Sequence, residues 1–229
     1  MKIFAISDLH LPGHDDKPMN KFGHNWDDHF NKIKMSWNKM VADDDLVLIS
    51  GDISWAMHTE DAADDLNDIC SLSGTKIIIK GNHDYWWNSI TKVRSMLSNN
   101  TYAIQNDAVN LDKVSIVGSR GWLCPGSPEF KQSDTKIYER EASRLEMSIK
   151  YADKSKPLIC MIHYPPFNER REDSLFTQVL EKYGIKYVLY GHLHGKACQN
   201  AFEGERNGVT YRLCSADFVK FSPTFIDEL

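Results

Sequence analysis

The sequence lacks a zinc or redox cysteine motif, an excess of basic residues and any long hydrophobic run. Its five cysteines form no CxxC pair, and their odd number argues against a complete set of disulfides. Lys and Arg total 27 against 32 Asp and Glu, and the net charge of −5 disfavours extended contact with nucleic acid. No stretch approaches the roughly 18 apolar residues of a membrane span. We therefore expect a chain without a membrane segment, located in a reducing cytoplasm.

Internal repeats, low-complexity tracts and Gly/Ser linkers are also missing. The composition, with 41% hydrophobic and 26% charged residues, is that of an ordinary globular protein. The amino terminus has too short an apolar run for a signal peptide. We therefore predict a single domain over residues 1–229.

Short hydrophobic runs that largely lack alternation predict strands buried on both faces. Five such runs stand out, at residues 3–6, 46–49, 77–79, 158–162 and 187–190. Between them, hydrophobic residues at helical spacing predict helices over 25–41, 60–72, 134–152 and 174–183. This alternation predicts an α/β fold with substantial parallel pairing. The runs at 102–104, 114–117 and 209–213 are expected to build a second sheet with a more exposed face.

Polar side chains follow each of the five hydrophobic runs. In chain order they are Asp8 and His10, Asp52, Asn82, His163, and His192 with His194. Because ligands bind at the carboxyl edge of the strands in α/β proteins, we expect these side chains to converge. Their seven nitrogen and oxygen ligands, with one carboxylate able to bridge, suffice for two metal ions.

Taken singly, an Asp, Asn or His after a strand is more often a cap or a turn residue than a ligand. Five such coincidences on five strands make that interpretation a poor one for the whole set. The other histidines lie in polar surroundings and are predicted to be surface residues: His14, His24, His29 and His58.

These segments resemble the five motifs of the calcineurin-like metallophosphoesterases, in the family's order: Asp8-x-His10, Gly51-Asp52, Gly81-Asn82-His83-Asp84, His163 and Gly191-His192-x-His194. The resemblance implies a four-layer α/β/β/α sandwich of two stacked mixed sheets with flanking helices. It also implies a dinuclear centre. One ion would take Asp8, His10, Asp52 and His194, and the other Asp52, Asn82, His163 and His192, with Asp52 bridging.

The chemistry implied by the resemblance is hydrolysis by a metal-activated hydroxide, with the two ions clamping the phosphoryl group. His83 would assist the leaving oxygen, and Asp84 would orient its imidazole. The family implies two divalent or mixed-valence ions, Mn or Fe, and the donor set also suits Zn, Co or Ni.

The sequence differs from three subfamilies of the metallophosphoesterases in ways that disfavour their particular functions. Trp55 stands where the purple acid phosphatases carry an iron-binding Tyr. The Ser/Thr protein phosphatases extend the Asp52 motif with Asp-Arg-Gly, where this chain has residues 53–57, and they carry Gly-Asn-His-Glu where this chain ends the motif in Asp84. His83 stands where the diacylglucosamine pyrophosphatases of lipid A synthesis carry Arg. A tyrosinate-bound iron, a protein substrate and that pyrophosphatase activity are accordingly disfavoured.

Four residues near the motifs are candidates for substrate contacts. Trp55 and Tyr164 lie within three residues of predicted ligands and could stack on a ring of the substrate, and Asn82 could contact the phosphate. Arg120 follows a strand candidate and could also meet a phosphate, although an exposed loop arginine is an equally good interpretation.

The expected function is hydrolysis of a phosphoester bond in a small soluble molecule. Phosphodiesters are slightly favoured over phosphomonoesters because His10 and the Gly-Asn-His-Asp sequence are retained. A nuclease is disfavoured by the acidic balance, and a non-catalytic metal-binding scaffold by the retention of every ligand. The sequence assigns no oligomeric state.

Overall fold

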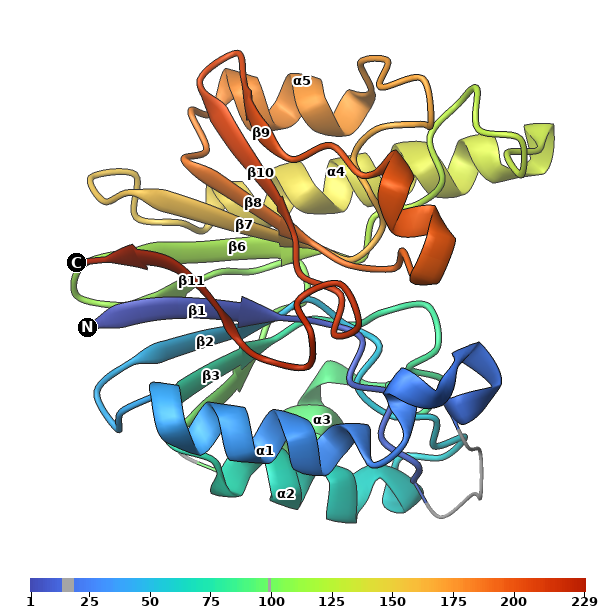
Figure 1. Cartoon of the computed structure of the whole chain (residues 1–229). Coiled ribbons are helices and arrows are strands. Elements are labelled where there is room, and N and C mark those ends of the chain that lie inside the picture. Colours follow the sequence, from blue (N-terminus) through green and yellow to red (C-terminus); the bar gives the residue numbers. More distant parts are fainter. Residues whose placement is uncertain (14–18, 99) are drawn as a thin grey trace.

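A computed structural model describes residues 1–13, 19–98 and 100–229 of the chain. Two mixed sheets of five and six strands stack face to face, and helices cover the outer face of each sheet (Figure 1). The α/β/β/α sandwich expected from the sequence is confirmed.

The first sheet has the strand order β11-β1-β2-β3-β4. Its strands are β1 (Lys2–Ile6), β2 (Leu46–Ile49), β3 (Thr75–Ile78), β4 (Thr101–Ala103) and β11 (Thr224–Glu228). Strands β1 to β4 run parallel, and β11 pairs antiparallel with β1. The parallel strands β1, β2 and β3 therefore end at one edge of the sheet.

The second sheet has the order β5-β6-β7-β8-β10-β9. Its strands are β5 (Val109–Asn110), β6 (Ser115–Ser119), β7 (Leu158–Ile162), β8 (Tyr187–Tyr190), β9 (Gly204–Arg206) and β10 (Val209–Leu213). The four central strands run parallel, and the edge strands β5 and β9 run antiparallel to their neighbours.

Helices cover the outer faces of the two sheets (Figure 1). The first sheet carries α1 (His29–Met40), α2 (Ala63–Ser71) and α3 (Ile90–Met96), and the second carries α4 (Thr135–Lys150) and α5 (Leu175–Lys182). Short 3₁₀ helices span Met19–Phe22, His24–Trp26, Glu60–Ala62, Gln132–Asp134 and Gly195–Asn200. No helix of the described residues is both long and apolar enough to cross a membrane.

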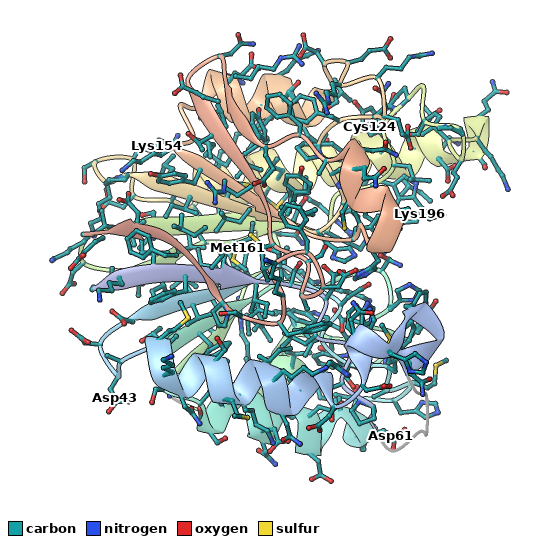
Figure 2. The ribbon with its side chains drawn as sticks, viewed as in Figure 1. Asp43, Asp61, Cys124, Lys154, Met161 and Lys196 are labelled. Carbon is teal, nitrogen blue, oxygen red and sulfur yellow. The ribbon has the colours of Figure 1, made fainter. Side chains whose placement is uncertain are left out.

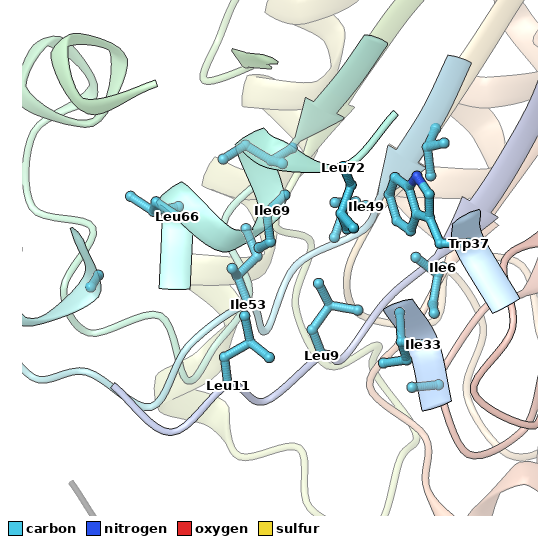
Figure 3. Close-up of a cluster of buried hydrophobic side chains, with 14 of the residues drawn as sticks. Ile6, Leu9, Leu11, Ile33, Trp37, Ile49, Ile53, Leu66, Ile69 and Leu72 are labelled. Atoms are coloured by element: carbon cyan, nitrogen blue, oxygen red, sulfur yellow. The ribbon is translucent and has the colours of Figure 1, made fainter. Parts of the chain in front are cut away.

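The central strands of the first sheet, β1, β2 and β3, bury both of their faces. In β1, Phe4 and Ile6 belong to the core beneath the helices, whereas Ile3 and Ala5 belong to the core between the sheets. Figure 3 shows the helix-side core, with Ile33 and Trp37 of α1 packed near Ile6. This double burial explains why these strands read as continuous hydrophobic runs.

The second sheet departs from two expectations. The segment 102–104 forms part of β4, which joins the first sheet and not the second. Strands β6 and β7 are buried along their whole lengths, so the second sheet has no exposed face there. Met161 of β7 lies in the core between the sheets (Figure 2). Helices α4 and α5 cover the face that was expected to be more exposed.

Four elements were not expected from the sequence: α3, β5, β9 and β11. Strands β5 and β9 have only two and three residues, too few for a pattern to be visible. Strand β11 is half-buried and carries charged residues, so its sequence does not resemble the buried runs. The short helix α3 buries only Val93 completely.

Lys76 in β3 is fully buried, which is uncommon for a lysine. Its Nζ donates hydrogen bonds to the carbonyl oxygens of Cys70, Leu72 and Gly74 around the end of α2. The side chain therefore satisfies carbonyl groups that the end of the helix leaves without partners.

We predict that Lys76→Met destabilises the protein by about 1–3 kcal/mol, because it leaves these buried carbonyls unsatisfied. Urea unfolding measures the change in the free energy of unfolding. The control is Lys136→Met at an exposed position of α4, which should change stability by less than about 0.5 kcal/mol. A Lys76→Met protein as stable as the control would show that the three hydrogen bonds contribute nothing.

Candidate metal centre

The loops that follow five strands bring all seven predicted ligands together at one edge of the sandwich. Asp8 and His10 follow β1, Asp52 follows β2, Asn82 follows β3, His163 follows β7, and His192 and His194 follow β8. The first three strands belong to one sheet and the last two to the other. The candidate site therefore spans the carboxyl edges of both sheets.

The first group of side chains is formed by Asp8, His10 and His194. Their ligand atoms lie within 4.8 Å of one another. His10 Nε2 is 3.3 Å from His194 Nε2, which in turn is 3.4 Å from Asp8 Oδ1. A cation among these three residues would contact two imidazole nitrogens and one carboxylate oxygen.

The second group is arranged around Asn82. The Oδ1 atom of Asn82 lies 2.7 Å from His163 Nε2 and 2.9 Å from His192 Nδ1. His163 Nε2 is also 3.4 Å from Asp52 Oδ2. These contacts bring one amide oxygen, two imidazole nitrogens and one carboxylate oxygen to a common place.

Asp52 lies between the two groups. Its Oδ2 is 3.8 Å from His10 Nε2 on one side and 3.4 Å from His163 Nε2 on the other. Its Oδ1 accepts a hydrogen bond of 2.8 Å from the backbone N–H of His83, which fixes the orientation of the carboxylate. One oxygen of Asp52 thus faces both groups.

Four of the seven side chains extend from backbone in the left-handed region. The φ angles of Asp8, His10, Asp52 and His192 are 59°, 45°, 52° and 73°. Such values are uncommon outside glycine and cluster at functional sites. Backbone hydrogen bonds from Asp8 to Gly51 and from His10 to Asp52 join the two loops. Hydrogen bonds between the neighbouring loops therefore stabilise these strained backbone conformations.

Two glycines pack so closely against the carboxylates that a side chain would not fit. A Cβ on Gly81 would overlap Asp52, and a Cβ on Gly191 would overlap Ser7 and the Asp8 carboxylate. Gly191 follows β8, and the next residue, His192, donates its backbone N–H to the Asp8 carboxylate at 3.0 Å. Both glycines are needed for the close approach of the loops.

The two carboxylates of the site are ionised although they are buried, with Asp8 and Asp52 only 0% and 1% exposed. Burial opposes the charge on Asp52, yet His163 holds its pKa at about 2. Burial likewise opposes the charge on Asp8, and nearby His194 keeps the pKa of Asp8 far below its usual range.

The four histidines divide into two that are protonated and two that are neutral. Burial opposes the charge on His163 and His194, but the adjoining carboxylates raise the pKa of His163 to about 9 and that of His194 to about 10. Burial lowers the pKa of His10 to about 4 and that of His192 to about 3. At neutral pH two imidazolium charges thus face three largely buried carboxylates, those of Asp8, Asp52 and Asp217, and balance only part of their charge.

This partial balance fits a metal centre. Buried carboxylates need a compensating charge, and metal binding displaces protons from histidine ligands. Metal cations bound at the two groups would neutralise the carboxylates in place of the protons on the imidazolium rings. The nitrogen and oxygen donors, without thiolate, suit divalent transition metals.

Contacts outside the two groups hold the imidazoles in place. His163 Nδ1 lies 2.9 Å from the carbonyl oxygen of Ser50, which leaves Nε2 to face Asp52. His194 Nδ1 lies 2.9 Å from Asp217 Oδ1, and the other oxygen of Asp217 accepts the N–H of Gly195. Such partners orient metal-binding histidines. Asp217 was not expected from the sequence, since it follows none of the five strands.

Asp84 does not orient His83, contrary to the expectation from the sequence. Its fully buried carboxylate accepts hydrogen bonds from five N–H groups, those of Asp52, Ile53, Ser54 and Gly81 and the indole of Trp86. Burial raises the pKa of Asp84 to about 6. The residue therefore joins the loops after β2 and β3.

His83 is half-buried beside the first group, and its ring centroid lies 5.8 Å from that of His10. Among the described residues, its buried Nδ1 has no hydrogen-bond partner. Burial lowers the pKa of His83. Trp55 stacks on His10 at 4.7 Å and lies 4.5 Å from the ring of His83.

The other predicted substrate contacts lie in two different places. Tyr164 is buried, and its ring lies 4.1 Å from that of His192, so it borders the second group. Arg120 lies over the ring of Trp122 at 4.6 Å and 3.5 Å from Glu141. It lines a separate cavity of about 250 Å³, whereas its carbonyl oxygen accepts the backbone N–H groups of His163 and Tyr164.

One of the histidines predicted to be a surface residue is part of the supporting structure. His29 Nε2 lies 2.8 Å from the carbonyl oxygen of Leu9, next to His10. His24 and His58 are exposed as expected, and His14 lies outside the described residues. The ring nitrogens of His29 lie against the carbonyl oxygens of Leu9 and Trp26, and a hydrogen bond from its one N–H to either of them holds the ring against the loop after β1.

Comparisons with known proteins agree with this geometry. A model of the calcineurin-like phosphoesterase family matches residues 1–196. The phosphopantetheinyl hydrolase PptH from Mycobacterium tuberculosis has a similar structure, with 14% sequence identity, a TM-score of 0.56 and coverage of 93% of this chain and 88% of that one. The protein of unknown function AQ665 from Aquifex aeolicus has 16% identity, a TM-score of 0.53 and coverage of 98% and 95%. At these identities the two structures show a shared fold alone. No curated protein matches the sequence.

We predict that Gly81→Ala reduces metal binding strongly, because the added Cβ displaces the Asp52 carboxylate that faces both groups. Metal content after loading with Mn²⁺ is measured by elemental analysis, and folding by circular dichroism.

The control for this experiment is Gly184→Ala. Gly184 also has a backbone that strains a side chain, with φ of +63°, but a Cβ there would meet nothing within 4 Å. It should cost stability and leave the metal content unchanged. A folded Gly81→Ala protein with full metal content would exclude Asp52 from the centre.

Proposed function

Since the chain belongs to the calcineurin-like phosphoesterase family, we propose that it binds two metal ions and hydrolyses a phosphoester bond of a small molecule. The observation that carries this proposal is the position of Asp52, whose Oδ2 faces both groups of candidate ligands. A single carboxylate shared in this way is what a pair of closely spaced ions requires.

The first ion is assigned to Asp8, His10, Asp52 and His194, and the second to Asp52, Asn82, His163 and His192. Both sets offer only nitrogen and oxygen donors. When bound, two such ions supply a hydroxide nucleophile at neutral pH and neutralise charge on the phosphoryl oxygens. Mn and Fe are the ions that we expect in this centre, as in the wider family.

The residues of the chain then have separate tasks. Asp84 fixes the loops that present Asp52 and Asn82, through its hydrogen bonds to backbone N–H groups. Ser50 and Asp217 orient the imidazoles of His163 and His194. Neither Ser50 nor Asp217 needs to contact the substrate.

His83 is assigned to the leaving group. Its backbone N–H binds Asp52, which anchors the residue at the centre while its ring stays outside both ligand groups. Trp55 packs beside the ring and limits its orientation. Burial lowers the pKa of His83, so the protonated form is the minor one at neutral pH, and it is this imidazolium that can donate a proton to the leaving oxygen as the P–O bond breaks.

Phosphodiesters are the preferred substrate class within this proposal, with phosphomonoesters as the alternative. A small phosphoester as substrate is supported by the name of a protein that shares the fold, the phosphopantetheinyl hydrolase of M. tuberculosis. The Mn²⁺-loaded protein should hydrolyse bis(p-nitrophenyl) phosphate faster than p-nitrophenyl phosphate. The opposite order would make the protein a monoesterase, and hydrolysis of neither would contradict the proposed function.

We predict that His83→Ala retains the bound metal and loses about 10²–10⁴-fold in turnover with alkyl esters, which need protonation of the leaving oxygen. The loss should be much smaller with nitrophenyl esters, whose leaving oxygen needs little protonation. Steady-state rates for both kinds of ester, together with metal content, provide the measurement.

The control variant is His58→Ala, which removes an exposed histidine outside the centre and should change neither rate. An equal loss for both esters would replace the acid role of His83 by general stabilisation of charge in the transition state. Loss of metal would make His83 a ligand or the support of one.

A further inference from the structure

A cavity of about 220 Å³ lies beside the second group of ligands. Tyr164 and His192 form the part of its wall that faces the candidate centre. Segments from distant parts of the chain complete it, among them those of Cys124 and of Ala197, which follows Lys196 (Figure 2). The cavity borders the centre, since His192 belongs to both.

The distance from the cavity to the assigned phosphate position is short. The rings of Tyr164 and His192 are 4.1 Å apart, and His192 Nδ1 is 2.9 Å from Asn82 Oδ1 in the second ligand group. A molecule whose phosphate lies between the two groups therefore extends its organic part past Tyr164 into this cavity.

The inner wall of the cavity is aromatic and carries no charge. Phe167 packs against Phe202 at 5.1 Å, and the hydroxyl of Tyr190 is already engaged with the carbonyl oxygen of Phe202. The thiol of Cys124 stays protonated, because burial raises its pKa to about 12. This wall suits an apolar body, which it would remove from water.

The only charged lining residues other than the titratable His192 are the exposed carboxylates Glu129 and Glu169. Neither makes an ion pair with a described residue, and no lysine or arginine is part of the lining. Arg206 and Arg171 lie over the rings of Phe167 and Phe202, at 5.4 Å and 6.0 Å from the ring centroids, but neither arginine is part of the lining. The charge that the lining residues themselves carry is therefore negative, whereas the phosphate at the centre requires positive charge.

We propose that this cavity receives the organic part of the substrate and favours an apolar group that carries an ammonium over one that carries a carboxylate or a second phosphate. The proposal rests on the proposed function, because it assigns the phosphate to the candidate centre. The protein should therefore hydrolyse phosphoesters of amino alcohols or aminomethyl phenols in preference to nucleotide-like polyanions.

Three aryl esters that differ only in charge test the proposal. They are the methyl phosphodiesters of 4-(aminomethyl)phenol, 4-methylphenol and 4-(carboxymethyl)phenol, in which the methylene group separates the charge from the leaving oxygen. With the Mn²⁺-loaded protein at low salt, kcat/KM should fall from the cationic to the neutral to the anionic ester, by about tenfold in all, the scale of two exposed charge pairs. This difference in kcat/KM should shrink at 0.5 M salt, because such charges are screened.

In the double variant Glu129→Gln/Glu169→Gln, kcat/KM for the cationic and anionic esters should differ by less than about threefold. The rate with the neutral ester measures any general loss of activity. Glu139→Gln/Glu205→Gln is the matched control, since it removes two exposed carboxylates that do not line the cavity. It should retain the wild-type difference in kcat/KM between the cationic and anionic esters. Ala197→Trp, at an exposed position of the lining, should raise KM for all three esters without changing metal content.

Two results overturn the proposal. Equal kcat/KM for the three esters in the wild-type protein would exclude charge selection by the cavity and leave the proposed function intact. Hydrolysis of none of them would count against the proposed function, and the cavity is then tested by calorimetric binding of the three phenols to the metal-loaded protein. Absence of a preference for 4-(aminomethyl)phenol in that titration would overturn the assignment independently of catalysis.

Discussion

The burial of two carboxylates, Asp8 and Asp52, is the constraint on which the rest of the site depends. Both are almost completely removed from water, and among the described residues no lysine or arginine pairs with them. The loops after β7 and β8 deliver the compensating imidazoles from the second sheet. The stacking of the two sheets is therefore what makes this compensation possible, because neither sheet alone carries both the carboxylates and enough bases.

The fold holds the centre at a cost in backbone strain. The left-handed conformations of Asp8, His10, Asp52 and His192 turn the loops so that their side chains reach a common place. Gly81 and Gly191 allow the loops to approach the carboxylates, and Asp84 joins two of these loops through backbone N–H groups. Strands buried on both faces support these loops.

The sequence was informative where a strand was long, buried and followed by a polar ligand. Strands β2, β7, β8 and β10 lie within the residues predicted for them, and all seven ligands converge as expected. Contacts between distant segments were not predictable: nothing in the local sequence shows that Asp217 meets His194, or that His29 braces the loop of His10. Asp84 was assigned to the imidazole of its neighbour because adjacency in sequence suggested it, whereas the turn directs its carboxylate to backbone groups. The same limit applies to the cavity beside His192, whose wall comes from several separate segments.

The central claim is that Asp52 bridges two metal ions, and anomalous diffraction from crystals of the Mn²⁺-loaded protein tests it most directly. The account predicts two manganese peaks per chain, about 3.5–4 Å apart, with the Asp52 carboxylate between them. One peak should lie against His10 and His194, and the other against Asn82, His163 and His192. A single fully occupied peak, or two peaks with Asp52 bound to neither or to only one, would contradict the account.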